Sequence, residues 1–334
     1  MKALFNRYFA EREAIDHALK LAVDRLPEPA ASIAAYHFGW TDSAGGSGSG
    51  KALRPLLTLL AAKSVAGAWN QVVPAAVAVE LVHNFSLVHD DIIDRDGVRR
   101  HRPTVWKAFG TTDALLAGDA MHALAFEVIA ESDGGLAADG ASLLAGTVRT
   151  LIEGQLADEL FEGREQVELS ECVAMSVAKT ASLMGCSTAL GAMLAGGSQQ
   201  QVESLREFGL RLGLAFQHID DLLGIWGDPN ITGKSRFSDL RNRKKSLPVT
   251  AALESTHIEV TELSRLYTNL EPLTEKQLHR VAELVESCGG RKASLDAAES
   301  LTLSAAAQLH SCGLEPEVVA ELTDLAKQIS GRVK

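Results

Sequence analysis

Apolar residues recur at helical spacing along almost the whole of this 334-residue chain, and this periodicity limits the folds that it can adopt. No run alternates between apolar and polar residues for long enough to form a half-buried strand. Hydrophobic residues make up 46% of the sequence but aromatic residues only 5%, so Leu, Ala and Val must fill the core. Leu and Ala are strong helix formers. The sequence therefore predicts an all-α fold, a bundle of helices packed around a common core.

The predicted helices cover most of the chain, with no linker between them. We expect them at residues 3–25, 55–67, 74–94, 112–132, 140–160, 168–195, 200–225, 247–252, 274–287, 291–310 and 315–329, with a short helical stretch that ends at Tyr36. A Gly/Ser-rich loop at residues 41–50 and a polar excursion at residues 227–246 interrupt the pattern. The chain is long enough for two domains joined by this loop. A basic helix start follows the loop directly, however, which favours a flexible active-site loop within a single domain over residues 1–334.

The net charge of −11 is spread along the chain. A nucleic-acid-binding protein would show a basic face, which this sequence lacks, so we expect no nucleic-acid partner. Short basic runs at residues 99–102 and 241–245 instead predict local sites for a small anion. The four cysteines are far apart and form no CxxC pair, so neither a zinc site nor a disulfide framework is expected.

The N-terminal segment, residues 1–23, carries charges throughout and lacks the uninterrupted apolar stretch of a signal peptide. A membrane-spanning helix needs about 20 consecutive apolar residues, and no window of the sequence approaches that length without a charge. The dispersed cysteines are typical of a reducing compartment. We therefore expect a cytoplasmic protein with no membrane span.

The strongest local signal is a pair of aspartates at the end of an apolar helical segment. Asp90 and Asp94 are four residues apart, so they lie on one face of a helix, where like charges repel unless a cation lies between them. Mg²⁺ prefers oxygen ligands and commonly bridges one or two carboxylates to substrate phosphates. A solvated acidic face is the alternative, but the preceding residues 77–88 are apolar and should be buried. His83 falls on the same stripe of the helix, at about 100° per residue.

A second apolar helical segment carries the adjacent Asp220 and Asp221, but residue 224 is Gly, so the carboxylate at i+4 is missing. Two acidic patches on two buried helices suggest facing walls of one metal–diphosphate pocket. Basic residues accompany the patches: Lys51, Arg54, Arg99, Arg100, Lys179, Lys234, Lys244 and Lys245. Each alone is more often a surface charge than a ligand. Arg and Lys are nevertheless the side chains that bind phosphates, and their joint placement favours a diphosphate site.

Short motifs follow one another along the chain in a fixed order. They lie at residues 50–55 (GKALRP), 80–83 (ELVH), 90–94 (DDIID), 99–100 (RR), 117–120 (AGDA), 154–155 (GQ), 179–180 (KT), 216–221 (FQHIDD), 233–234 (GK), 239–240 (DL) and 244–248 (KKSLP). This ordered set, which covers nearly the whole chain, resembles the trans-isoprenyl diphosphate synthases of the polyprenyl synthetase family, and among them the short-chain geranylgeranyl diphosphate synthases. Gly224 departs from the family, which usually has the last aspartate of the second motif there.

The resemblance implies a single-domain antiparallel helical bundle of the isoprenoid synthase type around a deep central pocket, usually as a homodimer. It implies that Asp90 and Asp94 bind two Mg²⁺ ions and that Asp220 binds a third. The residues expected to hold the allylic diphosphate are Arg99, Lys179, Thr180, Gln217, Lys234 and Lys244. Those expected to hold isopentenyl diphosphate are Lys51, Arg54, His83 and Arg100. The residues expected to act in catalysis are Asp90, Asp94, Lys179, Asp220 and Lys234.

The reaction implied by the resemblance joins the two diphosphates head to tail. Metal ions and cationic side chains stabilise the departing diphosphate. An allylic cation forms in an apolar cavity that excludes water, and the double bond of isopentenyl diphosphate attacks it. The released diphosphate is the expected proton acceptor, so no protein nucleophile is required. The sequence accordingly shows no convincing Ser/His/Asp or Cys/His arrangement.

The expected product is geranylgeranyl diphosphate (C20). Phe85 and Ser86 lie five and four residues before Asp90, and the motif has no insertion, a combination that resembles C20-forming enzymes. A bulky side chain would limit the depth of the pocket, although a helical wheel places Ser86 about 40° from Asp90 and Phe85 about 140° away. Plain core packing of Phe85 is an alternative, as is a farnesyl (C15) or longer polyprenyl product.

Two other functions remain open. A class I terpene cyclase has the same fold, but it does not need the second diphosphate site, for which the residues are present. A non-catalytic partner subunit should have lost metal ligands from the first aspartate motif, and this chain retains them. Fold alone does not determine function, so the second diphosphate site carries most of the argument for a prenyltransferase.

Overall fold

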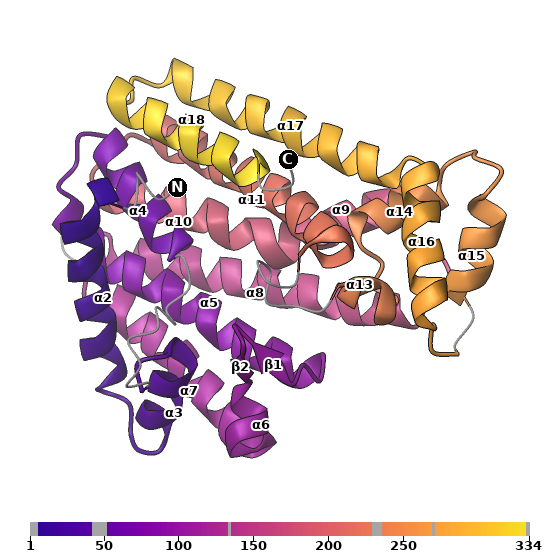
Figure 1. The fold of residues 1–334 in the computed structure, drawn as a ribbon. Helices are drawn as coiled ribbons and strands as arrows, with labels where there is room; N and C mark the ends of the chain where they lie inside the picture. Colours follow the sequence, from indigo (N-terminus) through magenta and orange to yellow (C-terminus); the bar gives the residue numbers. More distant parts are fainter. Residues whose placement is uncertain (1–5, 42–51, 133–134, 229–235, 269–270, 332–334) are drawn as a thin grey trace. The chain divides into compact units, whose positions relative to one another are not determined.

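The computed structural model describes residues 6–41, 52–132, 135–228, 236–268 and 271–331. Within these ranges every regular element is helical except one hairpin of two short strands, β1 (Val98–Arg99) and β2 (Arg102–Pro103), which pair antiparallel (Figure 1). This architecture confirms the all-α prediction. Of the predicted loop at 41–50, only Thr41 lies within the described residues. Residues 229–235 of the predicted excursion also lie outside them.

The helices follow the predicted segments closely. In chain order they are α2 (Phe9–Val23), α3 (Ala30–Phe38), α4 (Leu53–Ser64), α5 (Val73–Ile93), α6 (Val105–Phe109), α7 (Thr111–Ile129), α8 (Ala137–Glu162), α9 (Leu169–Ser176), α10 (Ser182–Leu194), α11 (Gln199–Trp226), α13 (Ser238–Arg241), α14 (Leu247–Leu253), α15 (Val260–Thr268), α16 (Glu275–Ser287), α17 (Gly290–Gln308) and α18 (Pro316–Ser330). The prediction missed α6, α15 and also α13, which lies within the predicted polar excursion. The five residues of α6 are too few to show a helical period, and α15 buries only Leu263 and Tyr267.

The helix predicted over residues 168–195 is interrupted in the structure. α9 leads through a π-helical turn, η2 (Val177–Ala181), into α10. The backbone of α8 lies directly against this turn, since a Cβ atom on Gly154 would be 2.3 Å from the backbone nitrogen of Lys179. A π turn inserts one extra residue into a helix and is frequent at functional sites. This one contains Lys179 and Thr180, both of which are predicted site residues.

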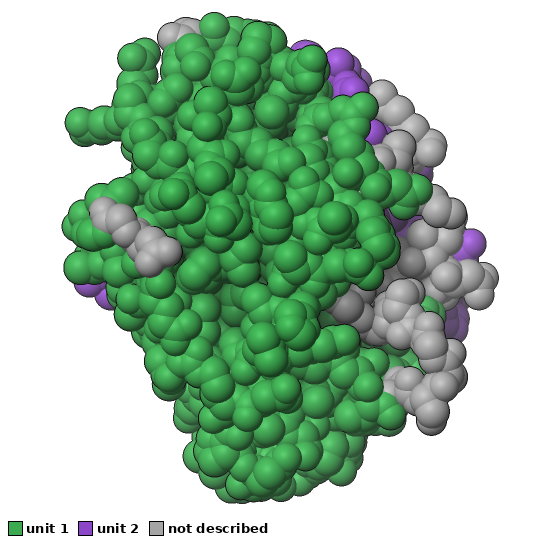
Figure 2. Space-filling view, turned by 90° about the vertical axis from the view of Figure 1, so that its left-hand side faces the viewer, with its two compact units in different colours: residues 1–148, 183–209, 308–322 green, residues 149–182, 210–307, 323–334 purple. Residues whose placement is uncertain are grey.

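The chain divides into two compact units. Unit 1 comprises residues 1–148, 183–209 and 308–322, and unit 2 comprises residues 149–182, 210–307 and 323–334 (green and purple in Figure 2). The boundaries fall within α8, α11 and α18 and at the ends of α10 and α17, so each of these helices contributes residues to both units. The single domain over residues 1–334 and its deep central pocket stay predictions.

Unit 1 is organised around α5, which packs against α2, α4 and α7. Among the described helices, the run Trp69–Ile93 that contains α5 could cross a membrane by length and composition alone, with a mean hydropathy of 1.4. Because 67% of its most apolar window is buried inside the protein, the run has the character of a core helix. The absence of a membrane span and the cytoplasmic location stay predictions.

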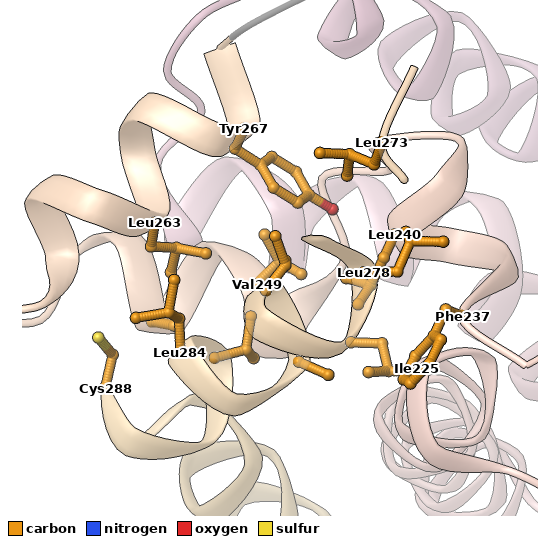
Figure 3. Close-up of a cluster of buried hydrophobic side chains, with 14 residues drawn as sticks. Ile225, Phe237, Leu240, Val249, Leu263, Tyr267, Leu273, Leu278, Leu284 and Cys288 are labelled. Atoms are coloured by element: carbon orange, nitrogen blue, oxygen red, sulfur yellow. The ribbon is translucent and has the colours of Figure 1, made fainter. Parts of the chain in front are cut away.

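A cluster of buried side chains holds the short helices of unit 2 together (Figure 3). It joins Ile225, near the end of α11, to Leu240 of α13, Val249 of α14, Tyr267 of α15 and Leu278 of α16. Helices this short are not stable by themselves in water, so tertiary packing rather than intrinsic propensity stabilises them. The cluster therefore fixes where α13 lies against α11, which determines the surroundings of the second aspartate motif.

We expect Gly191→Ala to destabilise unit 1, because α10 approaches the backbone of α4 at this residue. A Cβ atom on Gly191 would be 2.1 Å from the carbonyl oxygen of Thr58, which cannot rotate away. The expected loss is about 1–3 kcal/mol in the free energy of unfolding, measured by urea denaturation. Gly146→Ala in α8 is the matched control, since nothing lies within 4 Å of its added Cβ, and it should stabilise by about 0.5–1 kcal/mol. Equal losses in both variants would contradict the packing argument.

Candidate active site

The first aspartate motif lies at the C-terminal end of α5, in unit 1. Its middle member, Asp91, is only 1% exposed and receives hydrogen bonds from Nε of Arg99 at 2.8 and 3.0 Å, with an Nη2 contact at 2.8 Å. Asp90 is half-buried, and Asp94, the C-cap of the helix, is exposed. Asp91 thus points into the protein, whereas Asp90 and Asp94, one helical turn apart, are more exposed.

Arg99 belongs to the β1–β2 hairpin, whose turn is made of Arg100 and His101. Both turn residues have positive φ, 51° and 62°, a conformation that Asn and Gly usually adopt in two-residue hairpins. Non-glycine residues in this region carry strain and cluster at functional sites. The ion pair with Asp91 anchors the hairpin to α5 and so positions Arg100. Sequence reasoning missed Asp91, although its place beside Val88 on the buried face of the helix could have indicated an inward carboxylate.

Three residues predicted to hold isopentenyl diphosphate lie close enough in unit 1 to act on one another. Burial lowers the pKa of Arg54 to about 10, with Glu80 opposing the shift. Burial, and then the charges of Arg54 and Arg100, lower the pKa of His83 well below its ordinary value, so its imidazole is neutral at pH 7. Among the residues that the structure describes, none accepts a hydrogen bond from the buried Nε of Arg54. Two guanidinium groups and a neutral imidazole form a cationic cluster suited to an anion.

Glu80, which sequence reasoning left without a role, is the counter-ion of this cluster. It is 5% exposed and accepts a hydrogen bond at 3.0 Å from the side-chain nitrogen of Asn84. The side-chain oxygen of Asn84 in turn lies 3.1 Å from Nε2 of His37. Burial raises the pKa of Glu80, while Arg54 opposes the shift. One acid among these cations leaves the cluster with net positive charge, as binding of a diphosphate requires.

The second aspartate motif lies on α11, in unit 2, and repeats the pattern of the first. Asp220 is exposed, whereas Asp221 is 4% exposed and accepts hydrogen bonds from Gln217 at 2.6 Å and from the backbone nitrogen of Leu247 at 2.9 Å. Burial, and then the charge of Asp239, raise the pKa of Asp221 to about 7. Asp221 thus ties α11 to the start of α14 and leaves Asp220 at the surface.

Two further residues predicted to hold the allylic diphosphate contact each other in unit 2. Thr180, on the π-helical turn, donates a hydrogen bond to the side-chain oxygen of Gln217 at 2.7 Å. Because Gln217 in turn donates to Asp221, a continuous hydrogen-bond chain runs from the turn to α11 and α14. Such a chain fixes the rotamer of each member, so the polar atoms are already ordered before any substrate arrives.

Lys179 and Lys244, also predicted to hold the allylic diphosphate, share one carboxylate. Nζ of Lys179 is 2.6 Å from Oδ2 of Asp158, and Nζ of Lys244 is 3.8 Å from the same atom. Burial opposes the change, but the two lysines together lower the pKa of Asp158. Sequence reasoning missed Asp158. The only signal for it was Gly154, one turn earlier in α8, whose missing side chain allows the close approach of the π turn.

The two predicted chain-length residues differ in their surroundings. Phe85 is buried, and its ring lies 4.6 Å from that of His122 on α7 and 5.7 Å from that of His89. Ser86 is half-buried and donates a hydrogen bond to the carbonyl oxygen of His83 at 2.8 Å. Phe85 therefore packs toward α7, which fits core packing as well as a role in closing a cavity, and its effect on product length stays a prediction.

No group of three or more acidic, His or Cys side chains that could hold a metal occurs within the described parts of the chain. Mg²⁺ does not need one, because it is usually bound through one or two carboxylates together with substrate phosphates and water. The oxygens of Asp90 and Asp94, one turn apart, are a suitable donor set for it. Lys51 and Lys234, the remaining predicted site residues, lie outside the described residues.

The chain is similar to known proteins over most of its length. The family description polyprenyl synthetase matches residues 45–286. A (2E,6E)-farnesyl diphosphate synthase of Mycobacterium tuberculosis is 44% identical over 327 residues, covering 96% of this chain and 91% of that protein. A geranylgeranyl diphosphate synthase of the same organism is 39% identical over 323 residues, with the same coverage. The crystal structure of a polyprenyl synthetase from Streptomyces coelicolor A3(2) is similar with a TM-score of 0.92 and 42% identity, covering 98% of this chain and 99% of that one.

Substitutions at the inward and the exposed aspartate of the first motif should differ in their effect on stability. Asp91→Asn removes the charge that compensates the half-buried Arg99, so we expect the free energy of unfolding to fall by about 3 kcal/mol. Asp94→Asn changes an exposed carboxylate at a helix C-terminus and should alter stability by no more than about 0.5 kcal/mol. Urea denaturation of both variants checks this, and equal destabilisation by the two changes would show that Asp91 has no special structural role.

Proposed function

The chain belongs to the polyprenyl synthetase family and is a trans-prenyltransferase, and from this premise we propose that it condenses an allylic diphosphate with isopentenyl diphosphate to give geranylgeranyl diphosphate. The observation that carries the proposal is the cationic cluster of Arg54, His83 and Arg100, which is distinct from the aspartates of the first motif. A reaction that joins two diphosphates needs two anion sites, and a terpene cyclase needs only one.

Each part of the site has a role in this reaction. Arg99, Lys179, Thr180, Gln217 and Lys244, with Lys234, hold the allylic diphosphate. Arg54, His83 and Arg100, with Lys51, hold isopentenyl diphosphate. His83, being neutral, donates one N–H without adding charge. Asp90, Asp94 and Asp220 would hold three Mg²⁺ ions, which would supply positive charge against the leaving diphosphate.

The bond changes balance without a protein nucleophile. The C–O bond of the allylic substrate breaks, and the diphosphate leaves with the electron pair. The double bond of isopentenyl diphosphate forms the new C–C bond, and the proton lost from the adjacent carbon passes to the released diphosphate. Lysine and arginine side chains already ordered by Asp158 and Asp91 stabilise this developing anion without reorganising, which is the usual source of a large rate effect.

The C20 product is supported by Phe85, five residues before Asp90 on α5. Its ring is buried against α7 and is bulky enough to stop an elongating chain. The names of the relatives do not select one product length, because one relative is a farnesyl diphosphate synthase and the other a geranylgeranyl diphosphate synthase. Farnesyl diphosphate is therefore the alternative product.

We also propose a homodimer, in which α8 supplies part of the interface. Ile152, Leu156 and Leu160 repeat every four residues along this helix and are 44%, 59% and 70% exposed. Large apolar side chains that form a continuous exposed stripe mark an interaction surface. A second copy of the chain is the partner proposed for this stripe.

The activity is tested by incubating the purified protein with Mg²⁺, isopentenyl diphosphate and each of the C5, C10 and C15 allylic diphosphates, and then sizing the products. We expect a C20 diphosphate and no turnover after removal of the metal with EDTA. A C15 or longer product would keep the activity and overturn the assigned length. A cyclic hydrocarbon or alcohol formed without isopentenyl diphosphate would indicate a cyclase, and no turnover at all would indicate a partner subunit.

Substitutions at the two chain-length residues test the role of bulk on α5. Phe85→Ala removes a ring from the proposed end of the cavity, so products longer than C20 should form. Ser86→Phe adds a ring one residue nearer to Asp90 in the sequence and about 100° nearer on the helical wheel, and it should shorten the product to C15. Product sizing by chromatography after dephosphorylation gives the answer. If Phe85→Ala yields the wild-type product length, Phe85 serves only as core packing.

Leu156→Asp should convert the proposed dimer to a monomer, because it places a charge in the middle of the apolar stripe of α8. Light scattering after size-exclusion chromatography gives the mass. Leu303→Asp on α17 is the matched control, since Leu303 is 63% exposed and lies outside the stripe. A wild-type mass for Leu156→Asp, or an equal change in both variants, would exclude this part of α8 from the interface.

A further inference from the structure

Gly224 lies four residues after Asp220 on α11, at the position where the second aspartate motif lacks its last carboxylate. A Cβ atom on Gly224 would be 2.2 Å from Oδ2, 2.5 Å from Cγ and 2.8 Å from Oδ1 of Asp239. All three atoms belong to one carboxylate. The side chain of Asp239 therefore occupies the space next to α11 that a side chain at residue 224 would fill.

The fold holds this carboxylate in place. Phe237 and Leu240, on either side of Asp239 in the sequence, are 2% and 0% exposed and lie in the cluster that also contains Ile225, the residue after Gly224 (Figure 3). The hydroxyl of Ser238 lies 3.4 Å from the carbonyl oxygen of Gly224 and 3.2 Å from Oδ1 of Asp239. The backbone nitrogen of Lys244 donates to the carbonyl oxygen of Asp239 at 2.9 Å. Contacts on both sides of Asp239 thus fix the segment against α11.

We propose that Asp239 supplies the carboxylate that the second aspartate motif lacks, and that Asp220 and Asp239 together hold the metal ion assigned to this motif. The proposal rests on the function proposed above. Residues four apart on a helix have Cβ atoms about 5–6 Å from each other. A carboxylate beside residue 224 is therefore placed relative to Asp220 much as Asp94 is placed relative to Asp90. The second motif therefore has two neighbouring carboxylates, one from α11 and one from α13.

The competing explanation is that Asp239 is only structural, a polar residue that fits the gap left by glycine. The two explanations differ in what a carboxylate moved to residue 224 should do. If Asp239 holds metal, an aspartate at residue 224 can replace it once the side chain of Asp239 has been shortened to alanine. If Asp239 only fills space, the new aspartate adds nothing to metal binding.

The test measures Mn²⁺ binding by electron paramagnetic resonance, with inorganic diphosphate present, for the full-length chain and its variants. Asp239→Asn should weaken the affinity of one class of bound Mn²⁺ by at least roughly 10- to 100-fold, because this is already the usual effect of removing a group that only supports a metal ligand. The double variant Gly224→Asp/Asp239→Ala, in which alanine leaves room for the new side chain, should recover wild-type affinity to within about threefold, which corresponds to about 0.7 kcal/mol. Asp228→Asn, which removes an exposed acid four residues beyond Gly224, is the matched control and should bind as the wild type does.

Thermal unfolding of each variant shows whether it folds. If Asp239→Asn does not fold, Gly224→Ala provides the same test, because its methyl group displaces the Asp239 carboxylate without removing it and should weaken Mn²⁺ binding. Wild-type affinity in Asp239→Asn, or weakened affinity that Gly224→Asp fails to restore, overturns the proposal. A wild-type protein that makes no prenyl product and binds no Mn²⁺ with diphosphate would instead contradict the proposed function, so the two failures are distinguishable.

Discussion

A buried carboxylate is stable only when its oxygens are bonded, and this requirement shapes both aspartate motifs. Asp91 is bonded by Arg99, and Asp221 by Gln217 and the backbone of Leu247. In each case the bonded residue connects the helix to a separate segment: the β1–β2 hairpin in unit 1 and the start of α14 in unit 2. The inward aspartate therefore links its helix to another segment, whereas Asp90, Asp94 and Asp220 are more exposed.

The cationic side chains of the site also have partners of opposite charge. Lys179 and Lys244 share Asp158, and the charge of Arg54 is opposed by Glu80. Each acid is outnumbered by the bases around it, so each group is ordered and keeps net positive charge. Groups arranged in advance stabilise a leaving diphosphate more effectively than mobile ones, because no reorganisation is needed when the charge develops.

Most of the helices could be predicted from the sequence, and so could the helix faces that carry the aspartates. Helical periodicity located α5 and α11, and the i, i+4 spacing of Asp90 and Asp94 placed them on one face. The acids that order the site were missed, because their partners are distant in the sequence: Asp158 contacts Lys179 across 21 residues. Periodicity describes one helix at a time, whereas these contacts depend on how helices pack, as at the π turn beside Gly154.

Gly224 illustrates how a motif can be incomplete in the sequence while its chemistry is complete in space. Read along α11 alone, glycine at this position removes an acid and weakens the case for a metal site. The structure shows that the same glycine leaves room for Asp239, whose segment is fixed by burial of Phe237 and Leu240. Metal binding depends on the positions of the ligand oxygen atoms and not on which helix carries them. A missing aspartate in such a motif is therefore weak evidence for lost function until the space around it has been inspected for a carboxylate from elsewhere in the chain.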